Sequence, residues 1–316
     1  MKLGVLSNDR LAPTINWTTL GPPLLKPLAS SPDADLVSPP PLDYRNWKEW
    51  RSVLCRVRSF DTLFWMQGSS RPESAVWLPS ALAGRAHRSA FVVDAWRPVL
   101  GRIGALAIAQ RLDPCFVAFR EAYDELVVRF PRGHFEWLPF GVATDVFAEV
   151  SEMERDIFAY WMGRRHEALH RALLSYCLER GLKYYYTRRG GEISVPHELG
   201  RLVARSRYFV VTPPDLSNSG RTGGFSPLVM RYMEGLSAGA RLLGVLPKSG
   251  EYEALLPPEA MLLVRADGSD LATRLDEDTD NDAGWAAVRR GRDLVRERHS
   301  WSCRAEYIHQ RLANGG

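Results

Sequence analysis

Short apolar runs separated by amphipathic stretches make up the first half of the chain. The apolar runs predict strands at 3–7, 61–67, 90–96, 115–119 and 135–140. The stretch GRIGALAIAQRL (101–112) has helical periodicity, whereas the Pro- and Ser-rich stretch at 28–44 is expected to be a loop. Strands that alternate with helices predict βαβ units and a parallel sheet.

The same alternation restarts after residue 156. Strands are expected at 157–163, 182–186, 207–212, 240–246 and 260–264, and helices at 164–181, 195–204, 227–238, 267–275 and 282–299. The pattern therefore predicts two α/β halves with a seam at 145–156. Ligands of open parallel sheets bind beyond the carboxyl ends of the strands, so a cleft between the halves is the expected site.

Composition narrows the class of protein. The chain has 316 residues, of which 25% are charged and 45% hydrophobic, as is usual for a soluble globular protein. A net charge of only +4 gives no reason to expect nucleic acid or a membrane surface as a partner. The four cysteines are widely spread, which argues against a zinc ribbon and for buried thiols in a reducing compartment. We find no signal peptide and no apolar stretch long enough to span a membrane, so a cytoplasmic location is expected.

The segment GGFSPLVMRYMEGLSAGARLLG (223–244) carries the most chemistry. Its glycines precede a helical pattern, and the free N–H groups at a helix start attract phosphate. Glu234 offers two acceptor oxygens for sugar hydroxyls, and Arg231 lies three residues before it on the same helix face. From the residues alone, an ion pair on a helix surface is the simpler interpretation.

This segment resembles the nucleotide-sugar signature of GT-B glycosyltransferases, closest to the retaining group 1 family and its spore-coat-type branch. Glu234 matches the second acid of that signature, and Gly235, Ala238 and Gly239 follow as in the family. Ser226 stands in the place of the first acid, which contacts the sugar of the donor in the family. A serine at this place forms hydrogen bonds but carries no charge.

Three further stretches share the resemblance. FEWLPFGVATDVF (135–147) is similar to the end of the family's first domain, and FAYWMGRRHEALH (158–170) to the start of its second. The family often places a basic residue against the diphosphate at this second position, so the candidates are Arg164, Arg165 and His166. Residues 289–312 resemble the C-terminal helices, the last of which usually returns to the first domain.

The resemblance implies an α/β protein of GT-B fold, with two Rossmann-like domains whose parallel sheets face a central cleft. Residues 1–150 would form the acceptor-binding domain and residues 151–300 the nucleotide-sugar-binding domain. Residues 301–316 would form a helix that returns to the first domain.

The activity implied is that of a hexosyltransferase-like enzyme that uses a nucleotide diphosphate-sugar, with UDP-sugar favoured, and an unidentified acceptor. Transfer would retain configuration and need neither a metal nor a cofactor. Glu234 would bind the ribose of the donor, and Arg164 and Arg231 would neutralise the leaving diphosphate. The other donor-binding candidates are Ser226, Gly224, Phe225 and Arg165.

The first domain supplies the remaining candidates. Asp94 lies where relatives often place a histidine beside the reacting carbon, whereas His87 is expected in a loop. Asn8 and Asp9 follow the first strand and would contact the acceptor. A strand-end carboxylate that caps a turn is the simpler interpretation of Asp94, and a general base with inversion of configuration is another.

Two alternatives to a transferase remain open. A non-catalytic nucleotide-sugar or glycan-binding protein would share this fold, and Ser226 favours it modestly. A sugar-nucleotide 2-epimerase shares the architecture but has no matching cluster of His and Glu here. The acidic stretch DEDTDND (276–282) is interpreted as a solvated turn that caps the next helix, and the two histidines of HEALH (166–170) are not expected to bind a metal.

Overall fold

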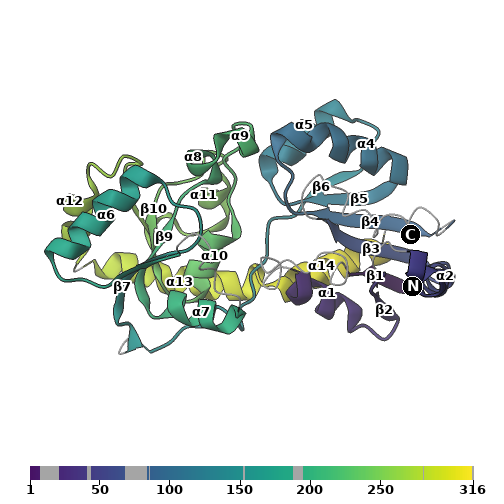
Figure 1. The fold of residues 1–316 in the computed structure, drawn as a ribbon, viewed down its shortest axis with the longest axis horizontal. Helices are drawn as coiled ribbons and strands as arrows, with labels where there is room; N and C mark the ends of the chain where they lie inside the picture. The colour runs from purple at the N-terminus through teal and green to yellow at the C-terminus, as the bar shows by residue number, and fades with distance from the viewer. Residues whose placement is uncertain are drawn as a thin grey trace. The chain divides into compact units, whose positions relative to one another are not determined.

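The computed structural model describes residues 1–7, 21–40, 44–67, 84, 86–151, 154–187, 195–279 and 281–314. The chain divides into two compact units (Figure 1). Unit 1 comprises Met1–Phe140 together with Trp301–Gly316, and unit 2 comprises Gly141–Ser300. The structure thus divides the chain at Gly141, ten residues before the boundary expected from the sequence.

Unit 1 is built on a parallel sheet of six strands in the order β2-β1-β3-β4-β5-β6. The strands are β1 (Leu3–Leu6), β2 (Ala34–Val37), β3 (Thr62–Gln67), β4 (His87–Val92), β5 (Leu112–Val117) and β6 (Phe135–Trp137). The described helices are α1 (Gly21–Ala29), α2 (Trp47–Val57), α4 (Leu100–Gln110), α5 (Arg120–Arg129) and α14 (Trp301–Asn314), with 3-10 turns η2 (Tyr44–Asn46) and η3 (Arg97–Val99). The C-terminal helix α14 packs against α1 within this unit (Figure 1).

Two elements of unit 1 differ from the sequence-based expectation. The stretch at 28–44 was expected to be a loop, but it contains the edge strand β2, which pairs with β1. Only Val37 of this strand is buried, so β2 has no apolar run that reveals it. The strand expected at 90–96 is β4, which ends at Val92 and begins at His87.

Unit 2 contains a parallel sheet of five strands in the order β11-β10-β9-β7-β8. The strands are β7 (Ile157–Trp161), β8 (Tyr184–Tyr186), β9 (Ser206–Val211), β10 (Arg241–Gly244) and β11 (Met261–Leu263). The described helices are α6 (Glu167–Glu179), α7 (Pro196–Ala204), α8 (Pro214–Ser217), α9 (Ser219–Thr222), α10 (Met230–Ser237), α11 (Glu251–Leu255), α12 (Leu271–Glu277) and α13 (Asp282–Arg298), with the 3-10 turn η5 (Pro258–Ala260).

Successive side chains of β9 pack into two separate hydrophobic cores of unit 2. Phe209 packs with residues of α7, α10 and α13, whereas Tyr208 and Val210 pack with residues of α6 and α12. Burial on both faces explains why β9 reads as a nearly continuous apolar run in the sequence.

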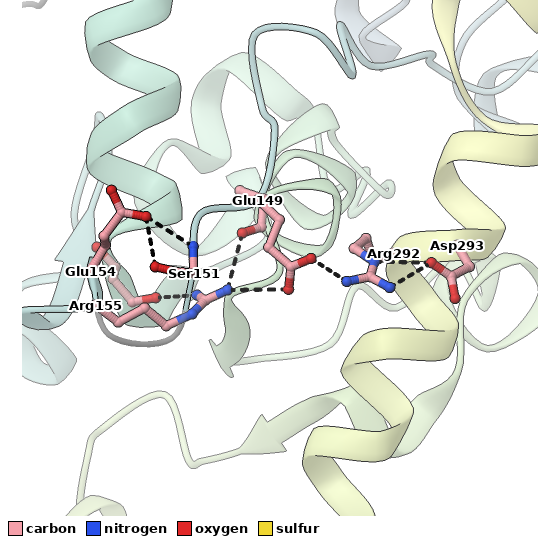
Figure 2. Close-up of polar contacts among 8 residues, drawn as sticks. Glu149, Ser151, Glu154, Arg155, Arg292 and Asp293 are labelled. Atoms are coloured by element: carbon pink, nitrogen blue, oxygen red, sulfur yellow. Dashed lines mark hydrogen bonds and ion pairs between the residues drawn. The ribbon is translucent and has the colours of Figure 1, made fainter.

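The segment that enters unit 2 is held by a chain of ion pairs (Figure 2). Glu149 pairs with Arg292 of α13 and lies 3.7 Å from Arg155, whose guanidinium also donates to the Ser206 carbonyl at 3.0 Å. The buried ring of Phe147 belongs to the core of unit 2. These contacts explain why residues 141–150 belong to unit 2 and not to the first domain.

A buried ion pair links β10 to the segment that precedes α13. Arg241 and Asp278 lie 2.7 Å apart, with side chains that are 3% and 1% exposed. Asp278 also accepts hydrogen bonds from Tyr208 at 2.9 Å and from Asn281 at 2.9 Å. The acidic stretch at 276–282 is therefore not wholly solvated, although Asn281 does cap α13 by accepting from the Gly284 amide at 2.8 Å.

None of the helices that the structure describes is long and apolar enough to cross a membrane.

We expect Asp278→Asn to destabilise unit 2 by about 3–5 kcal/mol, because it leaves the buried Arg241 guanidinium without its carboxylate. Urea unfolding measures the change. The control is Asp276→Asn in the same acidic stretch, where a half-exposed carboxylate pairs with Arg180 and contributes about 1 kcal/mol or less. Equal effects of the two variants would contradict a structural role for the buried pair.

Candidate functional site

The sequence-predicted donor residues come from loops at one edge of the unit 2 sheet. Because all five strands are parallel, the loops that follow β7, β9 and β10 leave the sheet at the same, carboxyl edge. Arg164 and Arg165 follow β7, whereas Gly224, Phe225 and Ser226 lie between β9 and α10. Arg231 and Glu234 lie on α10 itself.

Glu234 is a buried carboxyl group with an unused acceptor. The residue is 3% exposed, and its Oε2 has no hydrogen-bond partner among the described residues. Burial raises the pKa of Glu234 to about 7, while the positive charge of Arg231 opposes this shift. A buried carboxylate oxygen without a partner is costly, so this site is suited to a ligand that donates hydrogen bonds.

Arg231 is held against the loop that follows β7. A Cβ atom at Gly163 would lie 2.8 Å from the Arg231 Nη2, and the φ angle of Gly163 is +81°, a backbone conformation that favours glycine. The Trp161 indole fixes the same loop by donating to the Arg164 carbonyl at 3.2 Å.

The cations at this edge are close enough to interact. Burial lowers the pKa of Arg231, Glu234 raises it, and the neighbouring charge of Arg164 lowers it further. An anion between the two arginines would offset their repulsion, and guanidinium groups suit phosphate oxygens.

The sequence-based alternative of a surface ion pair between Arg231 and Glu234 is wrong. Glu234 is buried, and the structure records neither a hydrogen bond nor an ion pair between these two described side chains. Their electrostatic attraction acts over a longer distance, and Tyr160 of β7 lies within range of both charges.

Gly224 and Phe225 differ from the expectation of free amides at a helix start. The Gly224 amide donates to the Thr222 Oγ1 at 3.4 Å, and the Phe225 amide to the Thr222 carbonyl at 3.3 Å. Both belong to the turn that ends α9, whereas α10 begins only at Met230 and not at 227. The Phe225 side chain is buried.

Ser226 is fully buried and forms hydrogen bonds with side chains that the sequence did not connect to it. Its hydroxyl donates to Asp215 at 2.9 Å and accepts from the Lys248 amide at 3.2 Å. The loop is held again two residues later, where the Leu228 amide donates to the buried carboxylate of Glu251 at 2.8 Å. Asp215 and Glu251 had no sequence signal, because their contacts form only in the tertiary structure: Asp215 and Lys248 are 33 residues apart, and Glu251 and Leu228 are 23 residues apart.

Arg165 is bound to β8. Its guanidinium donates to the Thr187 carbonyl and lies 4.6 Å from the centre of the Tyr186 ring. His170, the second histidine of HEALH, is also a packing residue here, with its Nδ1 2.8 Å from the Tyr184 hydroxyl. Within the described residues, no group of three or more His, Cys, Asp or Glu side chains could hold a metal ion.

The candidates of the first domain are described with unit 1. Asp94 is half-buried just beyond the carboxyl end of β4, and its carbonyl accepts from the Trp96 amide at 2.9 Å. His87 is the first residue of β4, not a loop residue, and so lies at the opposite end of that strand. Asn8 and Asp9 lie outside the described residues.

Comparison with solved structures identifies the fold. Anabaena HepE, solved in complex with UDP-glucose, aligns with a TM-score of 0.64 and 12% identity over 99% of this chain and 100% of its own. The Thermosynechococcus elongatus sucrose-phosphate synthase aligns with a TM-score of 0.61 and 13% identity over 99% and 98%. The S. aureus MnaA–UDP structure aligns with a TM-score of 0.54 and 10% identity over 99% and 96%. The protein therefore has the GT-B fold of two Rossmann-like domains, as the sequence predicts.

A family match supports the same assignment. Residues 155–310, just under half of the chain, match the glycosyl transferase-like family. This match agrees with the resemblance to glycosyltransferases that the sequence shows. No curated protein matches the sequence.

We expect Glu234→Gln to stabilise the protein at high pH. The pKa of Glu234 is raised from 4.5 to about 7 in the folded state, so the folded state favours the protonated form. The free energy of unfolding therefore keeps this contribution below pH 4.5 and loses it as the pH rises through 7. The total loss is about 3 kcal/mol. A glutamine carries no charge, so the variant should gain about 3 kcal/mol at pH 8 and less than about 1 kcal/mol at pH 5.

Urea unfolding at the two pH values tests this, with Glu251→Gln as the matched control. Glu251 is equally buried, but its carboxylate accepts from Leu228 and from Ser249 at 2.7 Å. Its loss should destabilise the protein by about 1–3 kcal/mol. A Glu234→Gln variant without added stability at pH 8 would show that its carboxylate has partners in solution.

Proposed function

We propose that the protein transfers a sugar from a nucleotide diphosphate-sugar to an acceptor, with UDP-sugar as the favoured donor. The observation that carries this proposal is the buried, unpartnered Oε2 of Glu234 beside two arginines at the carboxyl edge of the unit 2 sheet. The HepE and MnaA structures, which share the fold, contain UDP or UDP-glucose and support this choice of donor.

The chemical groups of the donor match the chemistry of these side chains. Ribose carries adjacent hydroxyls that donate to a carboxylate, and Glu234 offers an unused oxygen. The diphosphate carries negative charge, which grows on the leaving group as the glycosidic bond breaks. Arg231 and Arg164 would stabilise that charge in the transition state, which is where fixed positive charge accelerates the reaction.

Transfer without a metal and with retention of configuration is part of this proposal. Two arginines supply the positive charge for which other transferases use a divalent ion. Transfer assays in EDTA test the first point, because lost activity that a divalent ion restores would contradict it. The anomeric configuration of the first-formed product, followed by NMR, tests the second.

We expect Glu234→Gln to weaken UDP binding about tenfold to a hundredfold, since a hydrogen bond to a charged group contributes about 1.5–3 kcal/mol. Wild-type affinity should also fall as the pH drops below 7, because the pKa of about 7 means that acid protonates the free carboxylate. The variant should lose this pH dependence. Calorimetric titration with UDP between pH 5.5 and 8.5 measures both effects.

The control for this titration is Glu253→Gln, which changes an exposed carboxylate on α11 and should leave the affinity within about twofold. UDP binding with the same affinity and pH dependence in Glu234→Gln would remove Glu234 from the site. GDP, ADP and TDP titrated in parallel identify the preferred base.

We expect Asp94→Asn to lower turnover by about 10²–10⁴ and to leave UDP affinity unchanged. The amide keeps the shape of the side chain but removes the charge that would act on the acceptor or the reacting carbon. Asp113→Asn, which removes a carboxylate that pairs with His134 at 2.8 Å in the same unit, is the control. Unchanged turnover in Asp94→Asn would leave this residue with a structural role at the end of β4.

A turnover assay also separates the transferase from a non-catalytic binding protein on the same fold. Release of UDP from UDP-glucose, UDP-galactose and UDP-N-acetylglucosamine should be detectable for at least one donor. Tight binding with no release and no transfer would support the binding protein instead.

A further inference from the structure

A second carboxylate lies at the same edge of the unit 2 sheet as Glu234. Asp215 follows β9 on α8, and it contacts Ser226 from the loop before α10 and Lys248 from the loop after β10. Its Oδ1 accepts from the Ser226 hydroxyl at 2.9 Å, and its Oδ2 accepts from the Lys248 ammonium at 2.9 Å. Two loops that are separate in sequence therefore hold one carboxylate in place.

The two oxygens of Asp215 are bound with different strength. Ser226 is fully buried, and its hydroxyl is itself fixed by the Lys248 amide, so the bond to Oδ1 is part of the interior. The Asp215 side chain is 8% exposed, whereas the Lys248 side chain that contacts its Oδ2 is 72% exposed. Oδ2 is thus bound by a donor from the surface, which a ligand hydroxyl would replace or accompany.

Support of the loop does not require Asp215. Glu251 already holds the loop at the Leu228 amide, and the Ser249 amide donates to the Ser226 carbonyl at 3.4 Å. Either oxygen of Asp215 also accepts further hydrogen bonds, because a carboxylate oxygen has two lone pairs.

The charges gathered at this edge indicate what Asp215 binds. Asp215 and Arg231 both act electrostatically on the hydroxyl of Tyr232, so both charges lie within range of that residue. The residues at the carboxyl edge of the sheet therefore include two acids and a pair of cations. A nucleotide diphosphate-sugar offers groups of matching kinds: ribose hydroxyls, a diphosphate and sugar hydroxyls.

We propose that Asp215 is the residue that binds the hydroxyl groups of the transferred sugar, and that Ser226 positions it for this role. The inference rests on the proposed function, since it assumes a nucleotide-sugar donor. Asp215 would then determine which sugar is bound, because its Oδ2 would accept a hydrogen bond from a sugar hydroxyl.

The test compares a ligand that has the sugar with one that lacks it. UDP and the three UDP-sugars named above are titrated calorimetrically into the wild type and Asp215→Asn. The variant should bind the best UDP-sugar about tenfold to a hundredfold more weakly, whereas its UDP affinity should change by less than about twofold. Ser226→Ala leaves the carboxylate but removes its positioning donor. This variant should also lower the ratio of UDP-sugar affinity to UDP affinity, but by less than Asp215→Asn.

Asp276→Asn is the matched control, because Asp276 also accepts from a hydroxyl, that of Tyr176 at 2.8 Å, and pairs with a cation, Arg180. Its ratio of UDP-sugar to UDP affinity should equal that of the wild type. Equal weakening of UDP and UDP-sugar in Asp215→Asn would make Asp215 a support of the loop and would overturn the inference, as would no change in either. A wild type that binds neither ligand would overturn the proposed function and this inference together.

Discussion

Burial of charge at the carboxyl edge of the unit 2 sheet is the constraint on which the rest of the site depends. The unit contains buried charges of two kinds. Arg241 and Asp278 are 2.7 Å apart, and Asp278 is further satisfied by Tyr208 and Asn281. Glu234 is as deeply buried, yet its Oε2 has no such partner among the described residues. The first arrangement satisfies its own charges, whereas the second leaves an acceptor that a hydrogen-bond donor would satisfy.

The loops around this edge are fixed by groups that have no part in binding. Glu251 holds the Leu228 amide, and the Trp161 indole holds the Arg164 carbonyl. Gly163 gives Arg231 room to lie against the loop after β7, because any Cβ atom there would meet its guanidinium. Since these supports are internal to unit 2, the arrangement of Glu234, Arg231 and Arg164 does not depend on a ligand to form. Such preorganisation lowers the entropic cost of binding.

The sequence predicts the central strands well because they are buried on both faces. β1, β3, β7 and β9 are apolar runs of strand length, and the glycosyltransferase signature around Glu234 adds the fold. β2 is missed because an edge strand with one buried residue has no hydrophobic pattern. Asp278 is misinterpreted because it lies in an acidic stretch that looks solvated. Nothing local in that stretch shows that Asp278 will form a buried ion pair with Arg241.

At the candidate site, too, the sequence shows the residue types but not their tertiary contacts. The residue types at 226, 231 and 234 are readable from the chain, but their surroundings are not. Ser226 suggests a lost charge, and only the tertiary structure shows that Asp215 brings a carboxylate to the same place. Likewise, the spacing of Arg231 and Glu234 suggests an ion pair on a helix surface, because local periodicity contains no information about which face of α10 is covered.

The packing of α10 explains why Glu234 does not escape to solvent. A Cβ atom at the next residue, Gly235, would lie 2.6 Å from Leu242 of β10 and 2.7 Å from Phe209 of β9. The helix backbone therefore lies directly on the sheet, and the residue beside Gly235 is drawn into the interior with it. A longer side chain at 235 would push the helix outward and hydrate the carboxylate, which would relieve its cost of burial. The small residue thus couples the close helix–sheet packing of unit 2 to the raised pKa of Glu234, because the packing that brings the helix onto the sheet also keeps the carboxyl group buried.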